Sequence, residues 1–186
     1  MRSVIVYFSR ADENYEVGTV TEGNTAKVAH EIARQTGAPM IEILPAKPYP
    51  TSYDGTVDRA KLELAENARP DIVTHGDMEA FTAADIIYLG YPIWCGEPPL
   101  ALITFIESHD WNGKTILPFI THGGSGFKET PAHIATAAGA GVRIDNGLAV
   151  LGTTAQCDPE ATAQAVRHWL SGTATSCRYG AQTAAQ

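Results

Sequence analysis

The sequence has little cysteine and no concentration of positive charge. Its 186 residues include only Cys95, Cys157 and Cys177, which lie far apart and form no C-x-x-C spacing. This argues against a disulfide framework or a zinc site. The formal net charge is −8, and we find no Lys/Arg cluster of the kind that binds nucleic acid or a membrane surface. We therefore expect no nucleic-acid partner and no metal.

Long hydrophobic runs are also missing. The longest ones, such as residues 86–95, are too short to span a bilayer and contain a glycine and a proline. The first three residues lead directly into a strand-like segment, without the pattern of a secretory signal. We expect no membrane insertion and a cytoplasmic location. The 44% of hydrophobic residues can supply the core of one domain.

Several catalytic motifs are absent as well. No G-x-G-x-x-G fingerprint follows the first apolar run, so a dinucleotide site of that type is excluded. Residues 123–127 read GGSGF, which ends in phenylalanine where a nucleophile elbow needs glycine. Residues 113–115 read GKT, but they lack the earlier glycine of a P-loop and lead into a strand. The first strand also ends in Phe-Ser-Arg, without the acidic residues of a phosphoacceptor domain.

What is present is an alternation of apolar strands with helical stretches. The expected strands are residues 4–8, 40–44, 85–91, 115–120 and 142–150, the last interrupted by Asn146-Gly147. The expected helices are residues 24–36, 56–67, 98–108, 132–138 and 158–169. This alternation predicts an α/β domain over residues 1–171 with a doubly wound parallel sheet covered on both faces. We expect residues 172–186, rich in Thr, Ser and Ala, to form a flexible tail.

Polar residues follow the first expected strand. Ser9 and Arg10 come directly after it, and Asn24 and Thr25 begin the next helix. In a doubly wound sheet, ligands bind beyond the carboxyl ends of the strands, and a helix N-terminus attracts phosphate. These residues therefore indicate a phosphate site. The ordinary alternative, that Asn24 or Thr25 simply caps the helix, stays open.

Two more loops follow the third and fourth expected strands. The first, residues 91–99, reads YPIWCGEPP and places Trp94 where it could form a platform for a flat ligand, or else pack onto the core. The second, residues 121–127, reads THGGSGF, and its glycines allow close approach of the backbone to a ligand. A plain surface turn is the alternative. Together the three loops indicate a ligand with a phosphate at one end and a flat polar ring at the other.

These loops resemble the flavodoxin family. The resemblance is carried by VYFSR…GNTAKVAHEIA, YLGYPIWCGEPP and PFITHGGSGF, and it extends over roughly residues 3–170. It implies a five-stranded parallel sheet of order 2-1-3-4-5 in three α/β/α layers, and FMN as the cofactor. The residues that it implies around FMN are Ser9, Arg10, Asn24, Thr25 and Ala26 at the phosphate, Pro92, Ile93, Trp94, Cys95 and Gly96 on one side of the ring, and Thr121, His122, Gly123, Gly124, Ser125 and Phe127 on the other.

The segment between the two halves of the phosphate loop departs from the short family pattern. Residues 11–22 form an insertion with several acidic residues, and a connection of this length is functional or disordered. We hypothesise that it forms a flap beside the site, with Tyr15 covering the flavin.

The resemblance implies redox chemistry without fixing its type. One hypothesis is an electron carrier that exchanges electrons with a redox partner protein through FMN. The alternative is an NAD(P)H-dependent FMN reductase of quinones or similar small acceptors, and a flavin-binding module without turnover is a third class. His122 is the candidate proton donor or cation beside the ring, unless its imidazole is bonded to the loop backbone.

Overall fold

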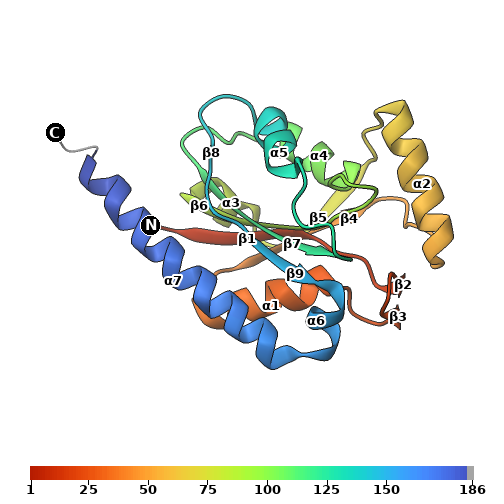
Figure 1. Ribbon diagram of the computed structural model, residues 1–186. Coiled ribbons are helices and arrows are strands. Elements are labelled where there is room, and N and C mark those ends of the chain that lie inside the picture. Colours follow the sequence, from red (N-terminus) through yellow and green to blue (C-terminus); the bar gives the residue numbers. More distant parts are fainter. Residues whose placement is uncertain (184–186) are drawn as a thin grey trace.

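The computed structural model describes the backbone of residues 1–183 and the side chains of residues 1–172. A central sheet carries helices on both faces (Figure 1). The strands of the sheet are β1 (Ser3–Phe8), β4 (Met40–Pro45), β5 (Ile72–His75), β6 (Ile86–Pro92), β7 (Thr115–His122), β8 (Arg143–Ile144) and β9 (Leu148–Leu151). The helices are α1 (Asn24–Thr36), α2 (Tyr53–Glu66), α3 (Met78–Ala83), α4 (Leu100–Glu107), α5 (Thr130–Ala138), α6 (Gly152–Cys157) and α7 (Pro159–Thr183).

The strand order is β5-β4-β1-β6-β7-β8, with β9 also paired to β7. Every pair is parallel except β4 with β5. The order β4-β1-β6-β7 followed by β8 and β9 is the predicted 2-1-3-4-5, so the doubly wound α/β fold is confirmed. Two details differ from the prediction: β5 adds an antiparallel strand at one edge, and the fifth expected strand is divided into β8 and β9.

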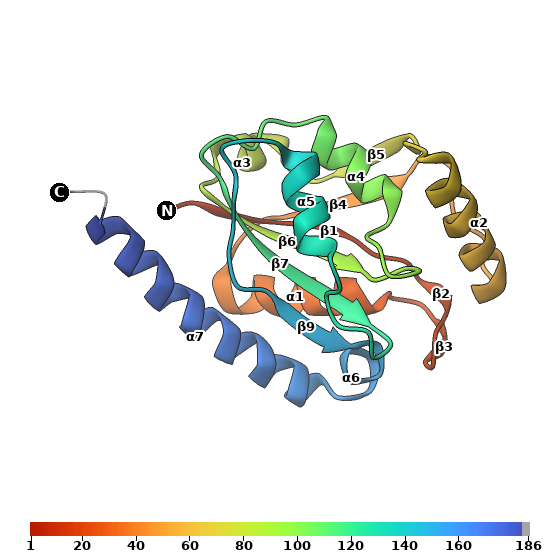
Figure 2. The same ribbon diagram turned by 45° about the horizontal axis from the view of Figure 1, so that its top comes forward.

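The central strand β1 shows why this sheet is buried on both faces. Val4, Val6 and Phe8 belong to one hydrophobic cluster, whereas Ile5 and Tyr7 belong to the other. Since successive side chains of a strand point to opposite faces, an unbroken apolar run needs a cover on each side. The first cluster is closed by α3, α4 and α5, and the second by α1, α6 and α7. Figure 2 shows these two sets of helices on opposite faces.

Helix α1 begins and ends for identifiable reasons. Its apolar residues Val28, Ala29 and Ile32 recur at helical spacing and are buried against the sheet. Gly37 follows the helix with φ of 70°, and its N–H donates to the carbonyl of Ala33, which is the usual way for glycine to end a helix. At the other end of α1, the Ala26 N–H donates to the Ser9 hydroxyl. The N-terminus of α1 therefore lies at the carboxyl end of β1.

Helix α2 lies apart from the helices that cover the two faces of the sheet. It stands beyond the carboxyl end of β1, next to a hairpin of β2 (Asp12–Asn14) and β3 (Gly18–Val20) (Figure 1). The insertion of residues 11–22 is thus an ordered hairpin. Helix α2 begins at Tyr53, three residues earlier than predicted, because the Ser52 hydroxyl accepts a hydrogen bond from the Gly55 N–H.

Some short elements were not predicted. They are the hairpin β2–β3, β5, α3 and α6. Helix α7 runs to Thr183, past the predicted end at residue 169. Residues 184–186 lie outside the described part of the chain, and the predicted flexibility of the tail stays a prediction. Among the described residues, no helix combines the length and the apolar character needed to cross a membrane.

Candidate functional site

A cleft of about 260 Å³ opens at the carboxyl ends of β1, β6 and β7. The expected site residues that line it are Ser9, Arg10, Asn24, Thr25, Pro92, Ile93, Trp94, Cys95, Thr121, His122 and Gly123. Thus all three loops meet at one place, as expected for parallel strands that end at the same edge. The remaining expected residues, Ala26, Gly96, Gly124, Ser125 and Phe127, do not line the cleft.

The N-terminus of α1 forms one end of the cleft. The Ser9 hydroxyl accepts a hydrogen bond from the Ala26 N–H at 3.0 Å, so Ala26 takes part through its backbone. Gly23 precedes the helix and supplies no side-chain cap. A Cβ on Gly23 would lie 2.3 Å from both the Arg10 carbonyl oxygen and the Ser9 hydroxyl. Only glycine allows this close approach of the two halves of the loop.

Arg10 joins this end of the cleft to the neighbouring segments. One of its Nη atoms donates to the Glu13 carbonyl at 2.6 Å, and the other donates to the carbonyls of Pro50 and Thr51 at 2.5 and 2.9 Å. Nε is buried and has no partner among the described residues. No carboxylate whose side chain the structure describes forms an ion pair with Arg10, and burial lowers the pKa of its guanidinium.

Two hydroxyls connect α1 to β7. The side chains of Thr25 and Thr121 are buried, and their oxygens lie 2.8 Å apart. Beside them, the Asn24 side-chain oxygen is buried and has no partner in the described part of the chain. A buried polar atom without a partner costs free energy. Asn24 and Arg10 both line the cleft, and each carries one buried polar atom without a partner among the described residues.

The glycine-rich loop after β7 is organised by His122. Its Nδ1 accepts hydrogen bonds from the N–H groups of Gly124 and Gly126, at 2.9 and 3.2 Å. The imidazole is therefore neutral with its proton on Nε2, and burial lowers its pKa. Of the two interpretations of His122, the bond to the loop backbone is the one found. Phe127 packs over Gly147 in the hydrophobic core.

Trp94 begins a tight turn after β6. It exchanges two backbone hydrogen bonds with Glu97, each of 2.9 Å. Cys95 and Gly96 between them have φ of 53° and 88°, the values of a type I′ turn. The Trp94 ring lies edge to face against Phe8, with ring centroids 5.4 Å apart. Trp94 therefore packs onto the core and lines the cleft at the same time.

One wall of the cleft was not predicted as a whole. Tyr15 was expected there, and the additional lining residues are Asn14, Glu16, Tyr53, Thr56, Val57, Ala60, Gly152 and Thr153. Tyr15 covers Gly123, since a Cβ on that glycine would meet the Tyr15 ring at 2.6 Å. The rings of Tyr15 and Tyr53 lie 5.9 Å apart. Gly152 and Thr153 follow β9, so the rule of strand ends could have identified them.

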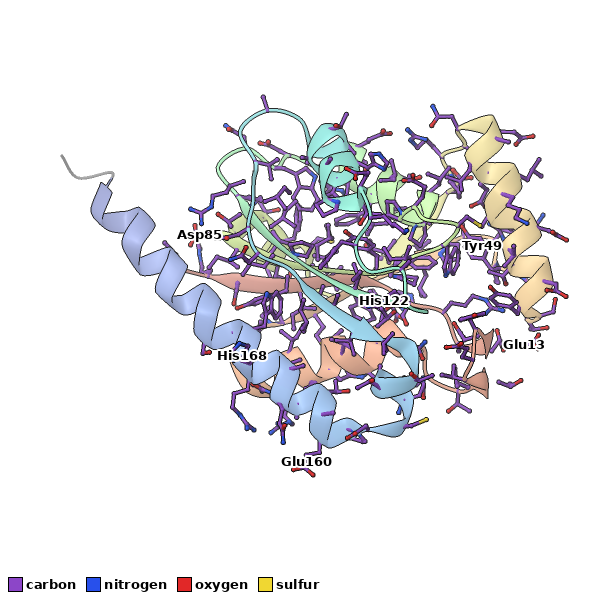
Figure 3. The ribbon with its side chains drawn as sticks, viewed as in Figure 1. Glu13, Tyr49, Asp85, His122, Glu160 and His168 are labelled. Carbon is purple, nitrogen blue, oxygen red and sulfur yellow. The ribbon has the colours of Figure 1, made fainter. Side chains whose placement is uncertain are left out.

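The hairpin and α2 form this wall together. The Tyr53 N–H donates to the Glu13 carboxylate at 2.8 Å, and the Glu13 N–H donates to the Thr51 carbonyl at 3.1 Å. In Figure 3, Glu13 on the hairpin, Tyr49 near α2 and His122 at the end of β7 lie toward the same end of the molecule. These contacts join residues about forty positions apart, and no local sequence signal predicts them.

A parallel sheet with a cleft at the carboxyl ends of its strands is the architecture of the doubly wound α/β proteins. A family model described as Flavodoxin matches residues 17–166. The chain belongs to the flavodoxin family, and the resemblance to that family is confirmed. No curated protein matches the sequence significantly.

Solved structures agree with this family. A candidate flavoprotein of Bacteroides eggerthii is 26% identical, with a TM-score of 0.70 over 93% of this chain and 98% of that one. A second, of Bacteroides uniformis, is 27% identical, with a TM-score of 0.66 over 89% and 97%. A Lactobacillus acidophilus flavoprotein in complex with FMN is 19% identical, with a TM-score of 0.61 over 82% and 94%, and shows the shared fold alone.

Proposed function

We propose that the chain binds FMN in this cleft and carries electrons through it. The observation that carries the proposal is Arg10, a partly buried cation held by carbonyls, with no carboxylate partner among the described side chains and with an unpaired Nε. Asp12 and Glu13 act on Arg10 only through space. A cation partly removed from water without a direct ion-pair partner is unfavourable, and an anionic group of a ligand would supply that partner. The first turn of α1 adds backbone N–H donors at the same end.

The residues present fit the parts of FMN. A phosphate offers acceptors to the Arg10 guanidinium and to the backbone N–H groups at the N-terminus of α1, while the hydroxyls of a ribityl chain offer donors and acceptors to the Asn24 side chain. Trp94, Tyr15 and Tyr53 provide aromatic surface for a flat ring. When bound, FMN supplies reversible electron transfer, which no side chain of this cleft provides.

His122 bears on the choice between carrier and reductase. Its Nδ1 is occupied by two backbone N–H groups, and protonation there would break both hydrogen bonds. The neutral ring adds no positive charge beside a reduced flavin and keeps only its Nε2 proton as a donor. The expectation of a cation that favours two-electron reduction is therefore removed. This supports the carrier over the reductase of small acceptors.

The test is FMN titration of the wild type, of Arg10→Met and of Arg34→Met. Arg34 is an exposed arginine of α1 that pairs with Glu31 and is absent from the cleft, so it controls for the loss of one positive charge. We expect Arg10→Met to raise the Kd for FMN about tenfold or more, because it removes a charge-assisted bond to phosphate, and Arg34→Met to leave it unchanged.

Two results would contradict the proposal. One is a wild type that binds no FMN, followed by flavin fluorescence. The other is an equal rise of the Kd for FMN in both variants, which would mean that Arg10 acts only through the net charge of the protein. Adding NADPH to the FMN-loaded protein separates the two functions: a carrier keeps its flavin absorbance without a partner enzyme, whereas rapid bleaching of that absorbance would favour the reductase.

A further inference from the structure

A buried carboxylate lies on α2, next to the segment that leads into this helix. Glu63 is only 8% exposed. One of its oxygens accepts a hydrogen bond from the Tyr49 hydroxyl at 2.7 Å, and the other accepts from Arg59 Nε at 2.8 Å. Removing an ion pair from water costs several kcal/mol, and a helix needs no such pair in order to form. An ion pair of this kind can instead fix the positions of the groups around it.

Arg59 and Glu63 fix Tyr49 from two directions. The Arg59 guanidinium carbon lies 3.9 Å from the centroid of the Tyr49 ring, and its Nη1 donates to the carbonyls of Lys47 and Pro48 at 2.9 and 2.7 Å. Burial, together with the hydrogen bond to Glu63, raises the pKa of the Tyr49 hydroxyl, so this group stays protonated and donates. The position of the ring is thus determined at its hydroxyl and at one face.

Tyr49 in turn packs against Trp94. Their ring centroids lie 4.9 Å apart at an interplanar angle of 81°, an edge-to-face contact of the favourable kind. Phe8 contacts both rings, at 6.1 Å from Tyr49 and 5.4 Å from Trp94. A continuous set of contacts therefore runs from Glu63 through Tyr49 to a ring that lines the cleft.

The orientation of the Trp94 ring depends on these ring contacts, whereas the other two tryptophans are also held by hydrogen bonds. The indole N–H groups of Trp111 and Trp169 donate to backbone carbonyls at 2.7 and 2.9 Å. Among the residues described, none accepts a hydrogen bond from the indole N–H of Trp94. Since the Trp94 indole makes no hydrogen bond to any described residue, its orientation is set by the rings packed against it.

We propose that Glu63 and Tyr49 are positioning residues that orient Trp94 in the cleft, and that this orientation sets how tightly a flat ring binds there. Glu63 acts through the Tyr49 hydroxyl, and Tyr49 acts through its ring. The first part of the proposal concerns the protein alone. The second part rests on the proposed FMN site.

The first part is tested without cofactor, by the emission of Trp94. Subtracting the spectrum of a Trp94→Phe variant from that of its parent isolates this tryptophan from Trp111 and Trp169. We expect Tyr49→Phe and Glu63→Gln to shift the Trp94 emission to the red and to increase its quenching by acrylamide, because the ring loses its fixed position. Glu107→Gln is the matched control, since it alters another Arg–carboxylate pair, with Arg69, that does not line the cleft.

The second part is tested by titrating the same variants with FMN. We expect the Kd to rise about fivefold in Tyr49→Phe and in Glu63→Gln, as for the loss of one buried hydrogen bond, with a shift of the visible flavin band. Glu107→Gln should bind as the wild type does. The band shift separates a displaced aromatic ring from a general loss of stability.

The outcomes distinguish this proposal from the proposed function. Unchanged Trp94 emission in a folded Tyr49→Phe protein overturns the proposal, even if Glu63→Gln does not fold. A red shift without any effect on FMN binding or on the flavin band overturns its second part. A wild type that fails to bind FMN contradicts the FMN site, while the emission measurement still decides whether Glu63 and Tyr49 orient Trp94.

Discussion

The two ends of the cleft are built differently. At the polar end, around the N-terminus of α1, Arg10 Nε and the Asn24 oxygen are buried without partners among the described residues. At the aromatic end, the rings of Phe8, Tyr49 and Trp94 are in mutual edge-to-face contact. The polar end thus has unused hydrogen-bonding capacity, whereas the aromatic end is largely satisfied within the protein.

This difference separates binding from stability. Unpaired buried polar atoms destabilise the free protein, and a ligand that pairs them recovers that cost. Packed rings stabilise the protein whether or not a ligand is present. We therefore expect substitutions of ligand-facing polar groups to change ligand binding more than folding. Substitutions that alter the close backbone approach at the same end should damage both properties.

The largest expected effect is that of Gly23→Ala, which prevents the close approach of Gly23 to Ser9 and Arg10. The new Cβ would lie 2.3 Å from a backbone oxygen of Arg10 and from the Ser9 hydroxyl, so the two halves of the loop must separate. We expect a loss of about 2 to 3 kcal/mol of unfolding free energy, typical of overpacking, together with the loss of FMN binding. Urea unfolding and FMN titration measure the two effects.

Gly172→Ala is the control for this substitution. Gly172 lies in α7, and an added Cβ there meets no atom within 4 Å. We expect this variant to match the wild type or to be slightly more stable, because alanine favours a helix. A Gly23→Ala protein as stable as the wild type would mean that the loop is loose and that close backbone approach does not shape the polar end.

The next effect concerns the two hydroxyls that connect α1 to β7. Thr25→Val or Thr121→Val leaves the other hydroxyl buried without its partner, at a cost of about 1 to 2 kcal/mol each. In the double variant both polar groups are gone, so we expect its loss to be smaller than the sum of the two single losses. Additive losses in urea unfolding would show that the 2.8 Å contact contributes no coupling.

The sequence predicts one side of the cleft better than the other. Ser9, Thr121 and Trp94 lie at or just beyond the carboxyl ends of strands in one parallel sheet, and the geometry of such a sheet brings these ends together wherever they stand in the sequence. Helix α2 could not be placed in this way, because its position depends on contacts such as that of Glu13 with Tyr53, forty residues apart. Its residues at the cleft, such as Val57, lie within an expected helix and not at a strand end.

Arg10 shows a further limit of prediction from sequence. It was expected as a phosphate ligand, and in the structure its Nη atoms donate to the carbonyls of Glu13, Pro50 and Thr51. Only Nε stays unpaired among the described residues. A motif gives the type of residue beside a ligand, but the division of its donors between ligand and protein depends on segments that the motif does not contain.

The smallest expected effect is the pH dependence of stability that His122 gives to the loop after β7. Burial lowers the pKa of His122 from its ordinary value of 6.5, so the folded protein binds this proton less readily than the unfolded chain does. Stability must then rise with pH wherever the unfolded chain holds more of that proton. The contribution is complete above the ordinary pKa and is lost as the pH falls below it.

We therefore expect the unfolding free energy of the wild type to fall more steeply between about pH 7 and about pH 5 than that of His122→Gln. The reason is that protonating Nδ1 breaks the hydrogen bonds from Gly124 and Gly126. NMR titration of the His122 ring gives its pKa in the folded protein directly, and we expect a midpoint below 6.5. A midpoint clearly above neutral pH would mean that most of the imidazole is charged in the folded protein at pH 7. It would then supply a cation beside the cleft after all, and the preference for a carrier over a reductase would have to be reversed.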